Sequence, residues 1–191
     1  MIYYIIKRVF DIIMSFLFLI IISIPLIIIA VCIKLTSKGP ILYWSDRVGL
    51  ENKIFKMPKF RTMYLNTPAV ATHLLKNPQT YITPIGSILR KFSLDELPQL
   101  LSIITGKMSF VGPRPALYNQ GDLVALRSER GIQHLIPGLT GWAQINGRDD
   151  LPIPTKVEFD DYYRRHRSFC FDLKILFITA IQVLKKEGVQ H

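Results

Sequence analysis

Residues 12–33 read IIMSFLFLIIISIPLIIIAVCI, and this run contains no Asp, Glu, Lys or Arg. At a rise of about 1.5 Å per residue, an α-helix of this length can cross a hydrocarbon core of about 30 Å. The run is too long for a signal peptide, and no small-residue cleavage site closes it. The sequence therefore predicts a membrane segment here, either a crossing helix or a segment that enters and leaves through one leaflet.

Basic residues lie on both sides of the apolar run: Lys7 and Arg8 precede it, and Lys34 and Lys38 follow it. Because basic residues mark the cytoplasmic side of a membrane, this pattern gives no direction for a crossing helix. Asp11 lies three residues after Arg8 on the same helix face, and we expect it at headgroup depth with Arg8 as its partner. The flanking charges therefore favour a segment that returns to its starting side.

Ser23 and Pro25 lie near the middle of the run. Pro25 cannot donate to the preceding turn and crowds it, which kinks a helix. The hydroxyl of Ser23 can bond the loosened backbone, which makes a break tolerable in lipid. We predict a re-entrant membrane anchor over residues 1–35, broken at Ser23–Pro25.

The remaining residues, 36–191, have the composition of a globular domain with many Pro and Gly residues. The predicted class is α+β, mostly helical, with a small cytosolic catalytic domain that carries interfacial amphipathic helices. The formal net charge of +10 suits anionic partners such as membrane lipids or nucleotide phosphates. Nucleic acid is disfavoured, because the apolar run commits the chain to a membrane and no groove-reading motif is present. Two distant cysteines predict neither a disulfide framework nor a metal site.

Two segments of the domain allow two interpretations each. Residues 53–61 alternate basic and apolar side chains, which is typical of a half-buried strand or of a cationic phosphate-binding edge. Residues 172–186 have the pattern of a helix with a broad apolar arc flanked by lysines. That helix can pack into the core or lie at the membrane interface.

An acidic pair, Asp95–Glu96, follows Ser93 at the start of a predicted helix that Gly106 ends. Ser93 and Glu96 fit a capping box, so the pair has a purely structural interpretation. Pro98 lies one residue deeper than a first-turn proline should, which allows the helix to begin later. In the first turn, free amides stabilise an anion, and an ionised Asp95 can act as a nucleophile or ligate Mg²⁺ beside a diphosphate.

Cationic residues flank this helix. Arg90 precedes it, and Arg114 follows it between two prolines. Prolines on both sides fix the backbone, which suits a guanidinium that must hold a phosphate, although a plain turn explains the same residues.

Residues 137–148 form a glycine-rich segment. Its three glycines allow the backbone to approach a ligand closely. Trp142 offers a stacking face, Gln144 an amide for hydrogen bonds, and Arg148 another cation. Together with the acidic pair, these groups suggest phosphoryl transfer from a nucleotide-linked donor.

Five motifs occur in series, and they cover essentially the whole chain: KRVFD at 7–11, KFRTM at 59–63, SLDELPQ at 93–99, GPRP at 112–115, and residues 137–148. This series is similar to the bacterial sugar transferase family, and in particular to its small monotopic polyprenyl-phosphate phosphoglycosyl transferases. The short chain resembles the minimal form of that family. One departure is that Ile24 separates Ser23 from Pro25, which in the family usually adjoin.

The resemblance implies a fold, a reaction and a location. Asp95 would attack the β-phosphate of a UDP-sugar, expel UMP and form a phosphoglycosyl-aspartate, from which undecaprenyl phosphate would take the sugar phosphate. Glu96 would assist, with Asp95 and Glu96 binding Mg²⁺, and Lys59, Arg90 and Arg114 would surround the phosphates. The enzyme would work on the cytosolic face of the bacterial inner membrane, at the first membrane step of glycoconjugate synthesis.

The sugar is predicted from one short segment. Residues 148–154 resemble members that handle N-acetylated 6-deoxy-hexosamines, so the chain is also similar to undecaprenyl-phosphate N-acetyl-deoxyhexosamine-1-phosphate transferases. A contrasting hypothesis is a non-catalytic protein that docks on acidic lipids through its positive charge. The sequence carries no indication of oligomeric state.

Overall fold

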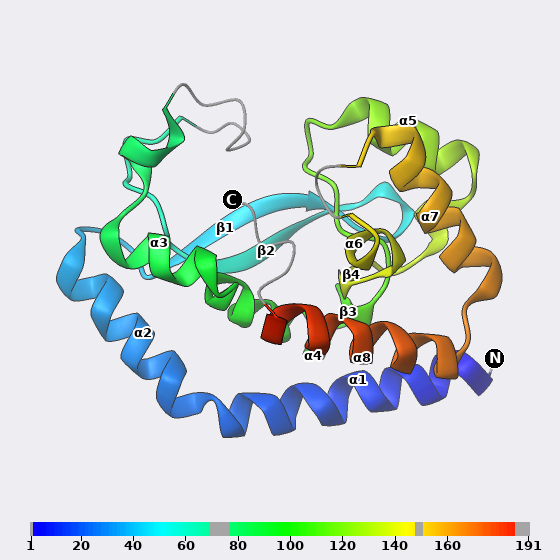
Figure 1. Ribbon diagram of the computed structural model, residues 1–191, viewed down its shortest axis with the longest axis horizontal. Coiled ribbons are helices and arrows are strands. Elements are labelled where there is room, and N and C mark those ends of the chain that lie inside the picture. The colour runs from blue at the N-terminus through cyan, green and yellow to red at the C-terminus, as the bar shows by residue number, and fades with distance from the viewer. Residues whose placement is uncertain (1, 69–76, 148–150, 186–191) are drawn as a thin grey trace.

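The computed structural model describes residues 2–68, 77–147 and 151–185. In these residues two small two-stranded sheets are surrounded by helices, and most of the chain is helical (Figure 1). The predicted α+β, mostly helical class is confirmed.

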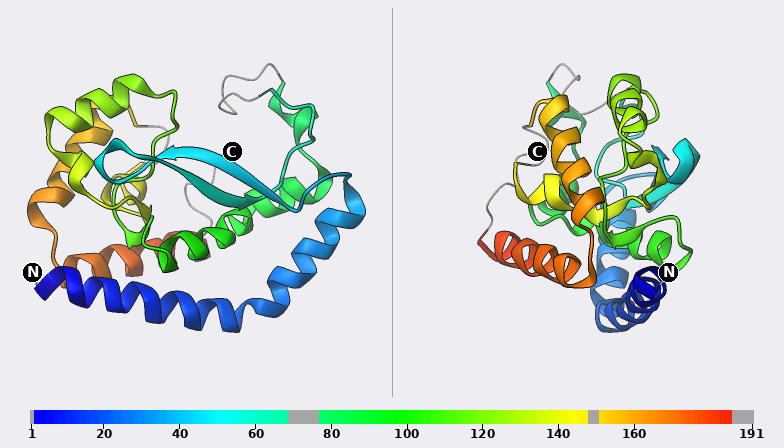
Figure 2. Two further views of the ribbon diagram at one scale, coloured as in Figure 1. Left: turned by 180° about the vertical axis from the view of Figure 1, so that it is seen from behind. Right: turned by 90° about the vertical axis from the view of Figure 1, so that its right-hand side faces the viewer.

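Two helices form the base of the molecule in Figures 1 and 2: α1 (Ile2–Ile21) and α2 (Ser23–Thr36). They are bent by 63° at the break between them, where Ser23 Oγ donates to the carbonyl of Ile20 at 2.8 Å. Pro25 lies in the first turn of α2, where a backbone N–H has no helical partner anyway. The predicted break is confirmed, and the intervening Ile24 does not prevent it.

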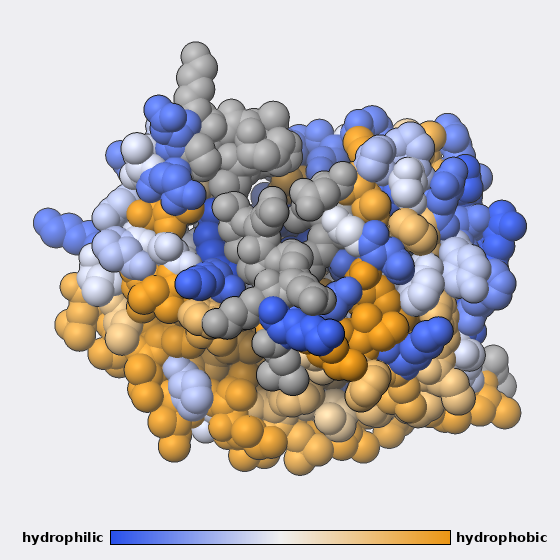
Figure 3. Space-filling view, in the orientation of Figure 1, coloured by the Kyte–Doolittle hydropathy of each residue, from blue (hydrophilic) through white to orange (hydrophobic). Residues whose placement is uncertain are grey.

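The outer surface of both helices is apolar. Asp11 and Ser15 are the buried residues of α1, whereas the side chains that face outward are large and hydrophobic. Figure 3 shows this surface as a continuous hydrophobic base. None of the described helices is by itself long and apolar enough to span a membrane, but the bent pair α1–α2 meets the requirement by length and composition.

The side chains of Arg8 and Asp11 bond to the domain and not to each other. Arg8 donates at 2.6 Å to the carbonyls of Ile103 and of Ile104, in the last turn of α4 (Leu100–Ile104). Asp11, 3% exposed, accepts from the amide of Phe110 at 3.3 Å. The predicted Arg8–Asp11 pair is wrong, because a helix C-terminus and a buried amide offer these charges better-placed partners.

A β-hairpin crosses the middle of the molecule. Strand β1 (Leu42–Val48) pairs antiparallel with β2 (Ile54–Phe60) through the turn η1 (Leu50–Asn52). A second sheet pairs β3 (Ser109–Val111) in parallel with β4 (Gly138–Thr140). The strand predicted from residues 53–61 is thus confirmed, and Lys59 lies on it.

The other helices pack around these sheets: η3 (Pro78–Tyr81), α3 (Pro84–Lys91), η4 (Leu94–Gln99), α5 (Gly121–Glu129), η5 (Ile132–His134), α6 (Trp142–Ile145), α7 (Ile153–His166) and α8 (Phe169–Lys185). The main core includes Ile103 and Ile175, and Phe10 of α1 packs against it. A smaller core joins Ile33 of α2 to Phe60 and to other residues of the domain. Both α1 and α2 therefore share apolar cores with the rest of the chain.

Helix α8 begins beside α1 and then runs away from it (Figure 2), and it fits both interpretations of its sequence. Ile175 is fully buried in the core, whereas Phe177 is 67% exposed and Leu173 is 42% exposed. One face of α8 therefore packs in the core, and another face exposes apolar side chains.

Candidate active site

The acidic pair lies in the short 3-10 helix η4, and α4 begins only at Leu100. Ser93 has a left-handed backbone (φ 54°, ψ 22°), and its side chain makes no capping hydrogen bond. The predicted capping box is therefore wrong. Pro98 falls within η4, and the α-helix begins only after it. The later start that the position of Pro98 in the sequence allowed is therefore confirmed. A left-handed residue other than glycine costs about 1–2 kcal/mol, and this one lies two residues before Asp95.

Glu96 is clamped by two cations from separate parts of the fold. Lys59 Nζ of β2 lies 2.7 Å from Oε1, and Arg114 Nη2 lies 2.6 Å from the same oxygen. Arg114 Nη1 also donates to Oε2 at 3.4 Å. Burial raises the pKa of Glu96, but the charges of Arg114 and Lys59 outweigh it and hold that pKa well below its usual range. Glu96 is therefore a fixed anion. Its carboxylate makes stronger, charge-assisted hydrogen bonds to these two cations than it would make to a backbone amide.

Asp95 is buried, with 7% of its surface exposed. Its Oδ2 lies 3.9 Å from Lys59 Nζ, so the lysine bridges the two acids. Burial lowers the pKa of Arg90, and the charge of Asp95 opposes that shift, so these two groups also interact. Arg90 is held from behind by Thr62 Oγ1, which accepts from its Nε at 3.0 Å. The structure thus gathers Lys59, Arg90 and Arg114 around the acidic pair.

The aromatic and amide residues lie elsewhere. Trp142 stacks on Tyr162 with ring centroids 5.8 Å apart and contacts Phe171, so it belongs to an aromatic cluster of α6, α7 and α8. Gln144 is 8% exposed, and neither of its amide atoms has a hydrogen-bond partner among the described residues. Within the described ranges, no hydrogen bond or ion pair joins either residue to the acidic pair. Arg148, with the first residues of the predicted sugar-recognition segment, lies outside the described residues.

Two of the three glycines in the 137–148 segment allow one chain segment to pack on another. A Cβ on Gly138 would lie 2.1 Å from the amide nitrogen of Gly112, and a Cβ on Gly141 would lie 2.1 Å from its carbonyl oxygen. Glycine is needed because two backbones meet, so the predicted approach to a ligand does not explain these two positions.

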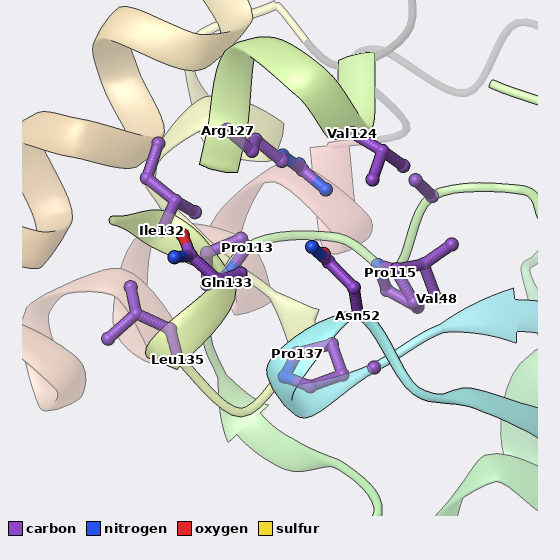
Figure 4. Close-up of a pocket in the computed structure, with 12 residues that line it drawn as sticks. Val48, Asn52, Pro113, Pro115, Val124, Arg127, Ile132, Gln133, Leu135 and Pro137 are labelled. Carbon is purple, nitrogen blue, oxygen red and sulfur yellow. The ribbon is translucent and has the colours of Figure 1, made fainter. Parts of the chain in front are cut away.

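A small cavity of about 30 Å³ lies behind the loop that carries Arg114 (Figure 4). Pro113, Pro115 and Arg127 line it together with η1 and η5 residues. It has room for a water molecule but not for a sugar nucleotide, and the acidic pair does not line it. No sequence pattern distinguished Arg127 from other helical residues, because charged residues on helices usually lie in solvent.

Metal binding at this site depends on few ligands. Among the described residues no group of three or more His, Cys, Asp or Glu side chains could hold an ion. Mg²⁺ commonly uses one or two carboxylates and takes its other ligands from substrate phosphates and water. Asp95 fits that role, whereas Glu96 fits it poorly because both of its oxygens already face Arg114.

The fold and the site together define a class of enzyme. In this class an apolar bent helix pair carries a domain, and a buried acid of that domain is surrounded by cations that can bind phosphate. The family model described as "Bacterial sugar transferase" matches residues 2–186. The chain belongs to the bacterial sugar transferase family and is a phosphoglycosyl transferase.

Three relatives illustrate the likeness. The exopolysaccharide production protein ExoY of Sinorhizobium fredii is 39% identical over 95% of this chain and 87% of its own length. The sugar transferase EpsL of Bacillus subtilis is 38% identical over 98% of this chain and 91% of its own. The UDP-glucose:undecaprenyl-phosphate glucose-1-phosphate transferase of Escherichia coli is 41% identical over 92% of this chain, but the match spans only 39% of that relative.

Proposed function

We propose that the protein transfers a sugar-1-phosphate from a UDP-sugar to undecaprenyl phosphate and releases UMP. The observation that carries this proposal is the buried Asp95 beside Lys59 and Arg90, with Glu96 held between Lys59 and Arg114. Three cations around two carboxylates leave one positive charge in excess, which would offset part of the negative charge of a donor diphosphate. The names of several relatives, which include undecaprenyl-phosphate transferases for glucose and galactose, support the same reaction.

The reaction would proceed in two displacements. An oxygen of Asp95 forms a bond to the β-phosphorus of the donor, and the bond to the bridging oxygen breaks, so the electron pair leaves with UMP. A phosphate oxygen of undecaprenyl phosphate then bonds to the same phosphorus and displaces the Asp95 carboxylate. Lys59, Arg90 and Arg114 would stabilise the charge that develops on the transferred phosphoryl group.

Glu96 would act by positioning rather than as a base, because a fixed anion with a strongly lowered pKa is a poor proton acceptor at neutral pH. Its carboxylate aligns Lys59 and Arg114 beside Asp95. When bound, Mg²⁺ would supply further neutralisation of the donor diphosphate, with Asp95 as its protein ligand.

The membrane arrangement is part of the proposal. We infer that α1 and α2 enter and leave the cytosolic leaflet of a bacterial inner membrane, with the domain on the cytosolic side and its positive charge facing anionic lipids. Leu94, the residue before Asp95, packs in the core that contains Ile33 of α2. The nucleophile therefore lies next to the junction with the anchor, where a lipid-linked acceptor can reach it.

A panel of UDP-sugars tests the reaction and its donor. Purified protein is mixed with undecaprenyl phosphate, Mg²⁺ and one UDP-sugar at a time, and UMP release is measured. We expect release from one donor class, with an N-acetylated 6-deoxy-hexosamine as the predicted donor and glucose and galactose as comparisons. Failure of every UDP-sugar would contradict the proposal, and omission of the lipid acceptor is the control for turnover.

A further inference from the structure

The loop that carries Arg114 is held to the rest of the protein by hydrogen bonds to four consecutive backbone carbonyls. Its prolines, Pro113 and Pro115, have no N–H to donate, so acceptor groups provide its hydrogen bonds. Each of four consecutive carbonyls has a different donor: Pro113 from Gly138 N (2.9 Å), Arg114 from Arg127 Nη1 (2.8 Å), Pro115 from Arg47 Nη1 (3.1 Å) and Ala116 from Val48 N (2.9 Å). The carbonyl of Arg114 itself accepts from a side chain, that of Arg127.

Arg127 is fixed by a buried acid on another helix. Its Nε and Nη2 donate to Oδ2 of Asp160 at 3.0 and 2.6 Å, while the remaining nitrogen reaches the loop. Asp160 is 1% exposed and Arg127 is 8% exposed. A planar guanidinium makes these bonds from three nitrogens held in one rigid fork, whereas the donors of a lysine ammonium all lie on one nitrogen and do not reproduce that spacing. The pair thus joins α7, α5 and the Arg114 loop.

Packing alone supports this loop incompletely. The small cavity in Figure 4 adjoins Pro113, Pro115 and Arg127 on the side of the loop that faces α5. Where neighbouring atoms are missing, contacts that would restrain a segment are lost, so polar bonds have a greater share in fixing its position. On the other side, the Arg114 side chain reaches Glu96.

We propose that Arg127, held by Asp160, is a positioning residue for the transfer reaction. It holds the backbone of Arg114 so that the Arg114 guanidinium meets both Glu96 and the donor diphosphate. This inference rests on the proposed function, because it takes Arg114 as a ligand of the UDP-sugar. Neither Arg127 nor Asp160 touches substrate in this proposal.

The test compares Arg127→Lys and Asp160→Asn with a matched control, Asp161→Asn. Asp161 adjoins Asp160 on α7 and is 4% exposed, but it pairs with Arg164 (2.8 Å), Arg165 (2.7 Å) and, at 3.9 Å, Arg130, and none of the hydrogen bonds that hold the Arg114 loop involves it. Steady-state UMP release gives kcat and separate KM values for the UDP-sugar and for undecaprenyl phosphate, and thermal unfolding of the same samples gives the melting temperature.

For Arg127→Lys, which keeps the ion pair with Asp160, we expect the donor KM to rise about threefold to tenfold. The acceptor KM should stay within about twofold, and the melting temperature should stay near that of the wild type. Asp160→Asn should act in the same direction, and Asp161→Asn should leave the donor KM unchanged. If the pair were merely structural, its loss would lower the melting temperature without a selective rise in the donor KM.

An unchanged donor KM in folded Arg127→Lys, or an equal rise in Asp161→Asn, would overturn the inference while leaving the transfer reaction intact. If Arg127→Lys does not fold, the apolar double replacement Arg127→Met with Asp160→Leu provides the same comparison without a buried unpaired charge. Wild-type protein that releases no UMP from any UDP-sugar would overturn the proposed function and this inference together.

Discussion

At the scale of single residues, Asp95 and Glu96 are neighbours with different surroundings. Glu96 is held at 2.7 Å by Lys59 and at 2.6 Å by Arg114, whereas Asp95 is 3.9 Å from the nearer of these cations. A carboxylate neutralised twice is a weak nucleophile, which supports the proposal that Asp95 attacks the donor while Glu96 aligns the cations. Their sequence positions alone would have allowed either assignment.

Replacement of Glu96 by Gln should slow the transfer without abolishing it. The amide keeps the shape of the side chain but loses the charge that aligns Lys59 and Arg114, and misplacement of such groups costs roughly tenfold to hundredfold in rate. UMP release under saturating donor measures the effect. A variant with wild-type turnover would show that the clamp on Glu96 has no part in the reaction.

The same variant makes a prediction about pH. Because the pKa of Glu96 is lowered in the folded protein, its ionisation stabilises the fold above the unfolded-state pKa of about 4.3, and this contribution is lost as the pH falls through the folded-state value. Glu96→Gln should therefore lower the melting temperature at pH 7, and the difference from wild type should shrink below about pH 4. A difference that is constant from pH 7 to pH 3 would contradict the ionised clamp.

The residue positions of the site could be predicted from the sequence better than their contacts could. Motifs that resemble a known family located the acids and the cations, but the local pattern at Ser93 suggested a capping box. The partners of Glu96 lie 37 and 18 residues away along the chain, beyond the reach of any local pattern. The Arg127–Asp160 pair spans 33 residues and carried no signal for the same reason.

At the scale of elements, the bend between α1 and α2 could be predicted because its causes are local. Pro25 and the hydroxyl of Ser23 act within one turn, and the structure has the bend there. The role of α8 could not be resolved in this way, since a protein core and a lipid interface both accept apolar side chains. Only the tertiary structure distinguishes its two faces: Ile175 is buried in the core, whereas Phe177 is exposed.

The re-entrant arrangement predicts where the two ends of the anchor lie. In a background with Cys32 and Cys170 replaced by Ser, Ile2→Cys and Thr36→Cys should both react with a membrane-impermeant maleimide only when the cytosolic face is accessible. Intact cells and inverted vesicles provide the two comparisons. Labelling of the Ile2 position in intact cells would instead indicate a helix that crosses the membrane.

At the scale of the whole molecule, α1 and α2, the proposed anchor, are built into the fold. Phe10 and Met14 of α1 pack against the main core, and Leu26 and Ile29 of α2 pack against the smaller one. Composition alone predicted a boundary near residue 35, and it could not reveal how far the two parts share apolar contacts.

Removal of residues 1–35 should therefore cost the domain much of its stability. The truncated chain loses the apolar partners of both cores and the two bonds that Arg8 makes to α4, so exposed core surface should promote aggregation. Thermal unfolding and size-exclusion chromatography, with the full chain in the same detergent as control, measure the difference. A monomeric fragment that unfolds cooperatively near the full-length melting temperature would show that 36–191 folds independently.

The most direct measurement is the mass of the protein after reaction with its UDP-sugar and Mg²⁺ in the absence of undecaprenyl phosphate. We predict an added mass equal to one sugar phosphate, located on the peptide that contains Asp95, released when the lipid acceptor is added and absent from Asp95→Asn. An adduct that persists in Asp95→Asn, or full UMP turnover by that variant, would contradict Asp95 as the nucleophile.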